Sequence, residues 1–130
     1  MGLNERRKIK ELQDTTFPER VKEIETICGK AIPYEVDWES LADDTQALNF
    51  IDNLSCHRLN MALRVICTDD MGKGAVRDGL KLIKLKNVPY KEAMAISFDN
   101  GVLAMHCAYA SGTDGMYSDS EIRQLLVQKL

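Results

Sequence analysis

Hydrophobic residues repeat with a helical period over three stretches of the chain. Between residues 17 and 28 they recur every three or four positions, and Gly29 follows where helices commonly end. From about residue 44 to residue 67 the apolar positions, plotted at about 100° per residue, cover about half of the circumference. This second helix is therefore expected to be central, with a kink or a break at 54–56. A third helix is predicted over about residues 70–81.

Residues typical of helix starts, together with a charged segment near the N-terminus, predict further helices towards both ends of the chain. Thr16 and Glu19 have the spacing of a capping box, and Ser118 and Glu121 repeat that spacing before a last apolar stripe. Residues 3–12 predict a short, highly charged helix with a thin apolar stripe. We therefore expect residues 1–15 to be loosely packed against the rest.

Alternating hydrophobic and polar residues predict strands. Residues 31–38 alternate in this way, and Pro33 places this strand at a sheet edge because proline donates no hydrogen bond. Residues 82–88 predict another strand. Asn100-Gly101 then joins two strand-like runs, since Asn-Gly favours the tight type I′ turn of a hairpin over residues 93–109. The turn sets a register that pairs apolar positions across the hairpin: Phe98 with Leu103, Ile96 with Met105, and Met94 with Cys107.

Together these elements predict one α+β domain over residues 1–130. The expected order is α-α-β-α-α-β-β-β-α, with a small, mostly antiparallel sheet of about four strands and helices packed on one of its faces. A chain of 130 residues is long enough to bury a core without disulfides.

Composition narrows the classes of partner. Hydrophobic residues make up 45% and charged residues 28%, which is typical of a globular protein. The net charge of −3 argues against a nucleic-acid partner, because a phosphate backbone demands a basic surface. No apolar run is long enough to span a bilayer and the first residues are polar, so we expect no membrane association and a cytoplasmic location. The cysteines are scattered and are expected to be buried, reduced thiols: Cys28, Cys56, Cys67 and Cys107.

The second face of the predicted hairpin is unusual. It carries small, nearly uncharged side chains where a solvated sheet would show polar ones: Ala93, Ala95, Ser97, Ala104, His106 and Ala108. Small side chains permit close approach, so this face predicts either a homodimer interface or coverage by the N-terminal helices.

Three residues are candidates for chemistry. His106 could act as an acid or a base, although its neighbour Cys107 points to the opposite side of a strand and cannot complete a dyad with it. His57 and Arg58 fall on the apolar side of the central helix. A buried arginine must be paired, so Arg58 predicts a bound anion or an acidic partner, for which Asp37, Asp69 and Asp70 are the candidates.

Sequence signatures of metal sites, phosphate-binding loops and catalytic nucleophiles are weak or missing. The cysteines lack the paired spacing of zinc ligands, the Gly72-Lys73-Gly74 segment is not a phosphate-binding loop, and no nucleophile elbow occurs. We therefore predict no metal and no cofactor. The first hypothesis is a non-catalytic protein that acts by binding or self-association. The alternative is a small hydrolase-like enzyme in which His106 or His57 works with a nearby aspartate in a pocket.

Overall fold

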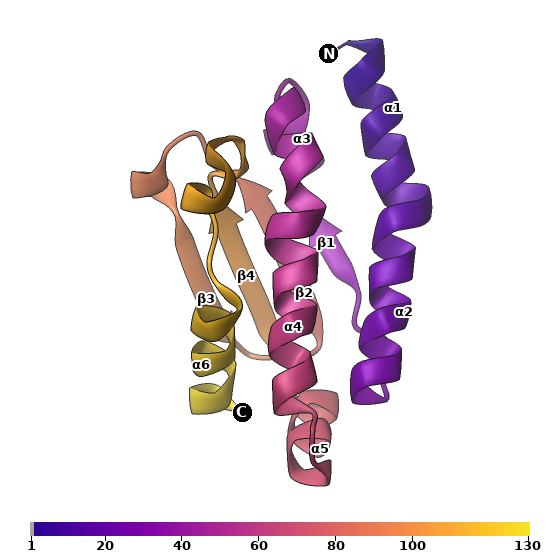
Figure 1. Cartoon of the computed structure of the whole chain (residues 1–130), viewed down its shortest axis with the longest axis vertical. Helices are drawn as coiled ribbons and strands as arrows, with labels where there is room; N and C mark the ends of the chain where they lie inside the picture. The colour runs from indigo at the N-terminus through magenta and orange to yellow at the C-terminus, as the bar shows by residue number, and fades with distance from the viewer. Residues whose placement is uncertain (1) are drawn as a thin grey trace.

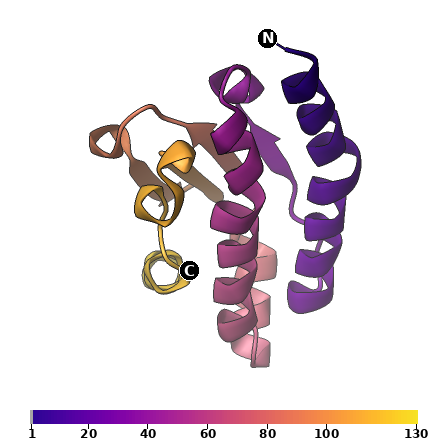
Figure 2. The ribbon, with the colours of Figure 1, turned by 45° about the horizontal axis from the view of Figure 1, so that its top comes forward.

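Residues 2–130 are described by a computed structural model in which helices cover one face of a four-stranded sheet (Figure 1). Figure 2 shows the same two layers from a tilted direction, with the helices in front and the sheet behind them. The predicted α+β class, the four strands and the one-sided helical cover are confirmed.

The sheet has the spatial order β1-β2-β4-β3. Its strands are β1 (Tyr34–Val36), β2 (Leu82–Asn87), β3 (Ala95–Asp99) and β4 (Val102–Cys107). β1 is an edge strand, as Pro33 predicts. The expectation of mostly antiparallel pairing is wrong, because β1 pairs with β2 in parallel, β2 pairs with β4 in parallel, and only β3 and β4 are antiparallel. The long helical connection from β1 to β2 crosses over the sheet and returns the chain in the same direction.

The hairpin forms with the predicted turn and register. Asn100 and Gly101 have positive φ angles of 53° and 81°, as a type I′ turn requires. Phe98 lies opposite Leu103 and Ile96 lies opposite Met105, which confirms two of the expected pairs. The third pair, Met94 with Cys107, does not form because β3 begins only at Ala95.

The first helical segment is longer than expected. Helix α1 (Leu3–Glu11) continues through a π-helical stretch (Leu12–Thr16) into α2 (Phe17–Cys28). Thr16 has helical angles of −65° and −55° and caps nothing, so the predicted capping box with Glu19 is wrong. None of the residues of α1 is fully buried, although Ile9 packs partly against the core.

The central helix contains a second π-helical stretch. Helix α3 (Thr45–Ile51) continues through Asp52–Cys56 into α4 (His57–Ile66), and the π-helical residues include the three at which a kink was expected. Helix α5 (Asp70–Gly79) leads into β2, and α6 (Asp119–Lys129) ends the chain behind the predicted capping box of Ser118 and Glu121.

The core lies between the sheet and the helices. Short 3-10 turns occur at Trp38–Leu41, Lys91–Ala93 and Tyr109–Gly115, and the last is interrupted at Gly112, where φ is 66° and ψ is −139°. The buried side chains of the sheet are those at alternate positions, such as Ile83, Leu85, Leu103 and Met105. All four cysteines are buried thiols, as expected.

Candidate functional site

The face of the sheet that the helices leave uncovered is the first candidate site. Along β4, Leu103, Met105 and Cys107 are buried beneath the helices. Because strand residues alternate, Ala104 and His106 point to the other side. We call this second side the open face. On β3 and β4 it presents Ala95, Ser97, Val102, Ala104 and His106.

The open face is divided into a neutral half and a charged half. Ser97 pairs with Ala104, and Ala95 pairs with His106, so most of the β3–β4 half carries small or uncharged side chains. The exception is at the hairpin turn, where Asp99 lies opposite Val102 and forms an ion pair with Lys129 of α6. On the other half, Lys84 and Lys86 of β2 lie beside Ala104 and His106 respectively. The Lys84 ammonium lies 3.2 Å from the carboxylate of Glu35 on β1, and both side chains are exposed. An ion pair this exposed contributes little to stability.

Two alanines expected on this face are elsewhere. Ala93 belongs to the 3-10 turn that precedes β3, so it does not join the row of strand residues. Ala108 is 1% exposed, because the chain leaves the strand conformation there, at φ −89° and ψ 72°. The alternation therefore ends at Cys107, and the expected interface shrinks to residues of β3 and β4.

His106 lines a shallow pocket at the charged half of the open face. The pocket has a volume of about 330 Å³, and its lining includes Glu35, Asp37 and Lys86. Among residues 2–130, no hydrogen bond or ion pair joins His106 to a carboxylate. The hydrolase hypothesis needs both a concavity and a carboxylate that orients the histidine, and the geometry supplies only the first.

His57 and Arg58 lie in the first turn of α4, in the helical layer. The sheet separates them from His106, so the structure does not bring the three candidates together. The Nε atom of Arg58 is buried with no hydrogen-bond partner in the described chain. Asp37 and Asp69 instead accept hydrogen bonds from the backbone N–H groups of their own turns, at Ser40 and Gly72. Among residues 2–130, no ion pair or hydrogen bond joins Arg58 to any of the three predicted partners, Asp37, Asp69 and Asp70.

The well-paired arginine is Arg20, which the sequence did not single out. Its guanidinium donates two hydrogen bonds to the carboxylate of Asp52, at 2.7 and 2.8 Å, and a third to Glu23 at 3.0 Å. The Asp52 hydrogen bond raises the pKa of Arg20 above its ordinary value. Burial tends to raise the pKa of Glu23, but hydrogen bonds from Asn60 and Arg20 outweigh it and lower that pKa. This cluster fastens α2 to the π-helical stretch of the central helix.

Two buried hydroxyl groups lie deeper in the core. The Ser55 and Tyr109 hydroxyls are 2.5 Å apart, and both residues are fully buried. The Tyr34 hydroxyl is buried near the Cys56 thiol. Burial is the main cause that raises the pKa values of Tyr34, Cys56 and Tyr109. All of these groups are therefore neutral and unreactive at ordinary pH.

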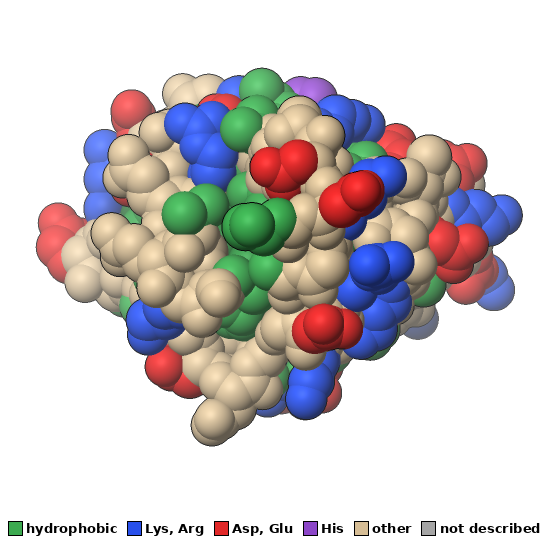
Figure 3. All heavy atoms as spheres, turned by 90° about the horizontal axis from the view of Figure 1, so that it is seen from below, with side chains coloured by type: hydrophobic (Ala, Val, Ile, Leu, Met, Phe, Trp, Pro, Cys, Tyr) green, Lys and Arg blue, Asp and Glu red, His purple; other side chains and the backbone are tan. Residues whose placement is uncertain are grey.

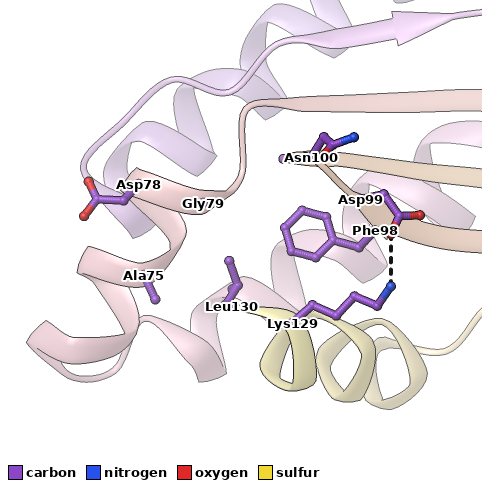
Figure 4. Close-up of a pocket in the computed structure, with 9 residues that line it drawn as sticks. Ala75, Asp78, Gly79, Phe98, Asp99, Asn100, Lys129 and Leu130 are labelled. Carbon is purple, nitrogen blue, oxygen red and sulfur yellow. Dashed lines mark hydrogen bonds and ion pairs between the residues drawn. The ribbon is translucent and has the colours of Figure 1, made fainter.

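A pocket of about 540 Å³ lies where the hairpin turn meets the end of α5 and the end of α6. Figure 3 views this end of the molecule and shows hydrophobic side chains gathered at its centre between charged ones. In Figure 4 the Phe98 ring lies between the hairpin and α6, and Asp78 points away from the other labelled residues. The Lys129 ammonium lies 3.2 Å from Asp99, and the lining contains no histidine or cysteine. The pocket thus lacks a group suited to proton transfer near neutral pH.

A third pocket, of about 430 Å³, lies beside Asn87 at the carboxyl end of β2. It is acidic, since Glu39, Asp43 and Asp44 contribute to its lining. Among the described residues, however, no three histidine, cysteine, aspartate or glutamate side chains are placed so that they could hold a metal ion. Within the same part of the chain, no helix has the length and apolar character that crossing a bilayer requires.

Comparison with known proteins assigns this chain to no family. No protein-family model, curated protein or solved structure matches this chain.

Proposed function

We propose that this protein acts by binding, as a homodimer whose two copies meet through the neutral half of their open faces. The observation that carries the proposal is the row of small side chains on β3 and β4, which no helix covers: Ala95, Ser97 and Ala104. Small side chains let a second sheet approach closely, as facing sheets do at about 10 Å.

The charges select one arrangement of the two copies. A two-fold axis perpendicular to the strands would place β2 over β2 and would bring the lysines of the two copies together. An axis parallel to the strands and over β4 instead places β2 of each copy above β3 of the other. Lys84 and Lys86 then face the small residues Ser97 and Ala95, which avoids repulsion between like charges.

The size of the face sets the expected affinity. The three strands that overlap in this arrangement, β2, β4 and β3, have six, six and five residues. At about 3.3 Å per residue and about 4.8 Å between strands, they give a patch of roughly 300 Å². A standard interface buries about 800 Å² per partner, so this dimer is expected to be weak, with a dissociation constant in the micromolar range. Self-association should therefore depend on protein concentration.

Sedimentation equilibrium of the full chain and of one variant tests this proposal. Ser97→Arg places a long charged side chain on the exposed edge strand β3, opposite Lys84 of the other copy, where it should oppose dimerisation without disturbing folding. Gln124→Arg makes the same change of charge at an exposed position of α6 and serves as the control. Circular dichroism establishes that both variants are folded.

The expected result is a dimer for the unsubstituted protein and for Gln124→Arg at high concentration, and a monomer for Ser97→Arg. A protein that remains monomeric up to about 500 μM would overturn self-association, because a dimer with a micromolar dissociation constant would be largely formed at that concentration. A Ser97→Arg variant that dimerises as strongly as the control would show that another surface is used, such as the free edges of β1 or β3.

A further inference from the structure

Two cysteines far apart in the sequence meet at the ends of two helices. Cys28 is the last residue of α2, and Cys67 follows the last residue of α4. Their sulfur atoms lie 3.0 Å apart, and the two residues are 0% and 5% exposed. Both are thiols in this structure. A covalent bond between them requires the sulfur atoms to approach by only about 1 Å, to about 2.05 Å.

We propose that Cys28 and Cys67 form a reversible disulfide by exchange with a small-molecule disulfide. The thiolate of one cysteine attacks the small disulfide, forms a mixed disulfide and releases one thiol. The second cysteine, also as a thiolate, then attacks the protein-bound sulfur of the mixed disulfide and releases the second thiol. Two protein thiols are oxidised by two electrons, one small disulfide is reduced to two thiols, and the protons of the protein thiols end on the released thiols.

The closed structure protects this pair. Burial, followed by the neighbouring Cys67 thiol, raises the pKa of Cys28, so that this cysteine stays protonated while the pair is enclosed. Both residues are also buried, so reaction requires an opening at this end of the molecule, after which the Cys28 thiol regains its ordinary acidity. The rate of oxidation should then report the population of the open state.

Helix α5 is the element whose movement would open the pair. It begins three residues after Cys67 and packs against the end of α2, where the Lys30 ammonium donates a hydrogen bond to the Arg77 carbonyl at 3.1 Å. The charge of Lys73 lies close enough to affect the Cys28 thiol. Figure 1 shows α5 at the end where α2 and α4 finish. The helix has ten residues, of which three are glycines, and glycine weakens a helix.

Two of these glycines provide opposite tests of the opening. A Cβ atom added at Gly74 meets nothing closer than the end of the Arg77 side chain at 3.9 Å, so Gly74→Ala should stabilise α5. A Cβ atom at Gly72 would lie 1.7 Å from the carbonyl oxygen of Ile66. Gly72→Ala must therefore displace the first turn of α5 from the end of α4.

The experiment exposes the folded, reduced protein to oxidised glutathione without denaturant and maps the products by mass spectrometry of peptides under non-reducing conditions. We expect one cross-link, between Cys28 and Cys67, with Cys56 and Cys107 unmodified, and reversal by excess reduced glutathione. The cross-link closes a loop of about 40 residues and should raise the melting temperature by roughly 10 °C. Cys67→Ser should show neither the cross-link nor the rise.

The glycine variants then test the route of access. Gly74→Ala should slow cross-linking about fivefold, and Gly72→Ala should accelerate it. The absence of a Cys28–Cys67 cross-link, equal modification of all four cysteines, or a cross-link that leaves the melting temperature unchanged would overturn the proposed site. A rate that Gly74→Ala leaves unchanged would overturn the opening through α5, even if Gly72→Ala does not fold.

Discussion

The hydrogen bond between Ser55 and Tyr109 allows a quantitative test of the core. Tyr109→Phe removes one hydroxyl without changing the shape of the ring and leaves the Ser55 hydroxyl buried without its partner. An unsatisfied buried hydroxyl costs about 1 to 3 kcal/mol. For a chain of 130 residues this corresponds to a fall of roughly 4 to 10 °C in melting temperature.

The magnitude is expected near the lower end of that range. The Cys107 thiol interacts with both hydroxyls, and a thiol is a weak substitute for the missing partner. Ser55→Ala should cost a similar amount, because it leaves the Tyr109 hydroxyl buried in turn. The double variant removes both polar groups, so its loss should be smaller than the sum of the two single losses by about 1 kcal/mol.

Urea unfolding followed by circular dichroism measures all four proteins of this cycle. Tyr90→Phe is the control, because Tyr90 is 68% exposed and loss of its hydroxyl should change the free energy of unfolding by less than about 0.5 kcal/mol. Losses that simply add in the double variant would refute the direct hydrogen bond, and with it the packing of the Tyr109–Gly115 turn on the central helix.

Two further predictions concern other buried groups. Asp52→Asn removes the carboxylate charge that pairs with Arg20, and it should lower the free energy of unfolding by about 1 to 2 kcal/mol in urea titrations. Asp99→Asn weakens an exposed ion pair with Lys129 and should lower that free energy by less than about 0.5 kcal/mol. Equal losses in the two variants would contradict the difference in burial. Burial raises the pKa values of Tyr34 and Tyr109 in the folded state, so the stability that they contribute is complete below the unfolded pKa of about 10 and is lost as the pH rises above it. The free energy of unfolding should therefore fall above about pH 10, and an alkaline spectrophotometric titration should show two of the four tyrosines ionising only as the protein unfolds.

Local signals in the sequence predicted the local structure well. Asn100-Gly101 specified the hairpin and its register, because both positions need positive φ and the alternation fixes which side chains are buried. Ser118 and Glu121 marked the start of the last helix, and Pro33 marked an edge strand. Each of these signals acts over a few residues, which is why it can be recognised in a sequence.

Features that depend on distant contacts were not predictable. The pairing of the strands is one, since the alternation of side chains is the same in parallel and antiparallel strands, and only the helical connection between β1 and β2 favours a parallel pair. The choice of Arg20 as the paired arginine is another, because Asp52 lies 32 positions away and reaches Arg20 through the packing of two helices. The pair of Cys28 and Cys67, 39 positions apart, is a third.

The proposed role of the open face depends on the alternation of side chains along β4, which turns Ala104 and His106 away from the helices. A dilution series recorded by two-dimensional nitrogen–proton NMR tests that role most directly, because it reports each backbone amide separately. The proposed dimer predicts concentration-dependent shifts at Ala95, Ser97, Ala104 and His106, together with slower translational diffusion at high concentration. Spectra and diffusion that do not change with concentration, or shifts confined to the helices, would contradict it.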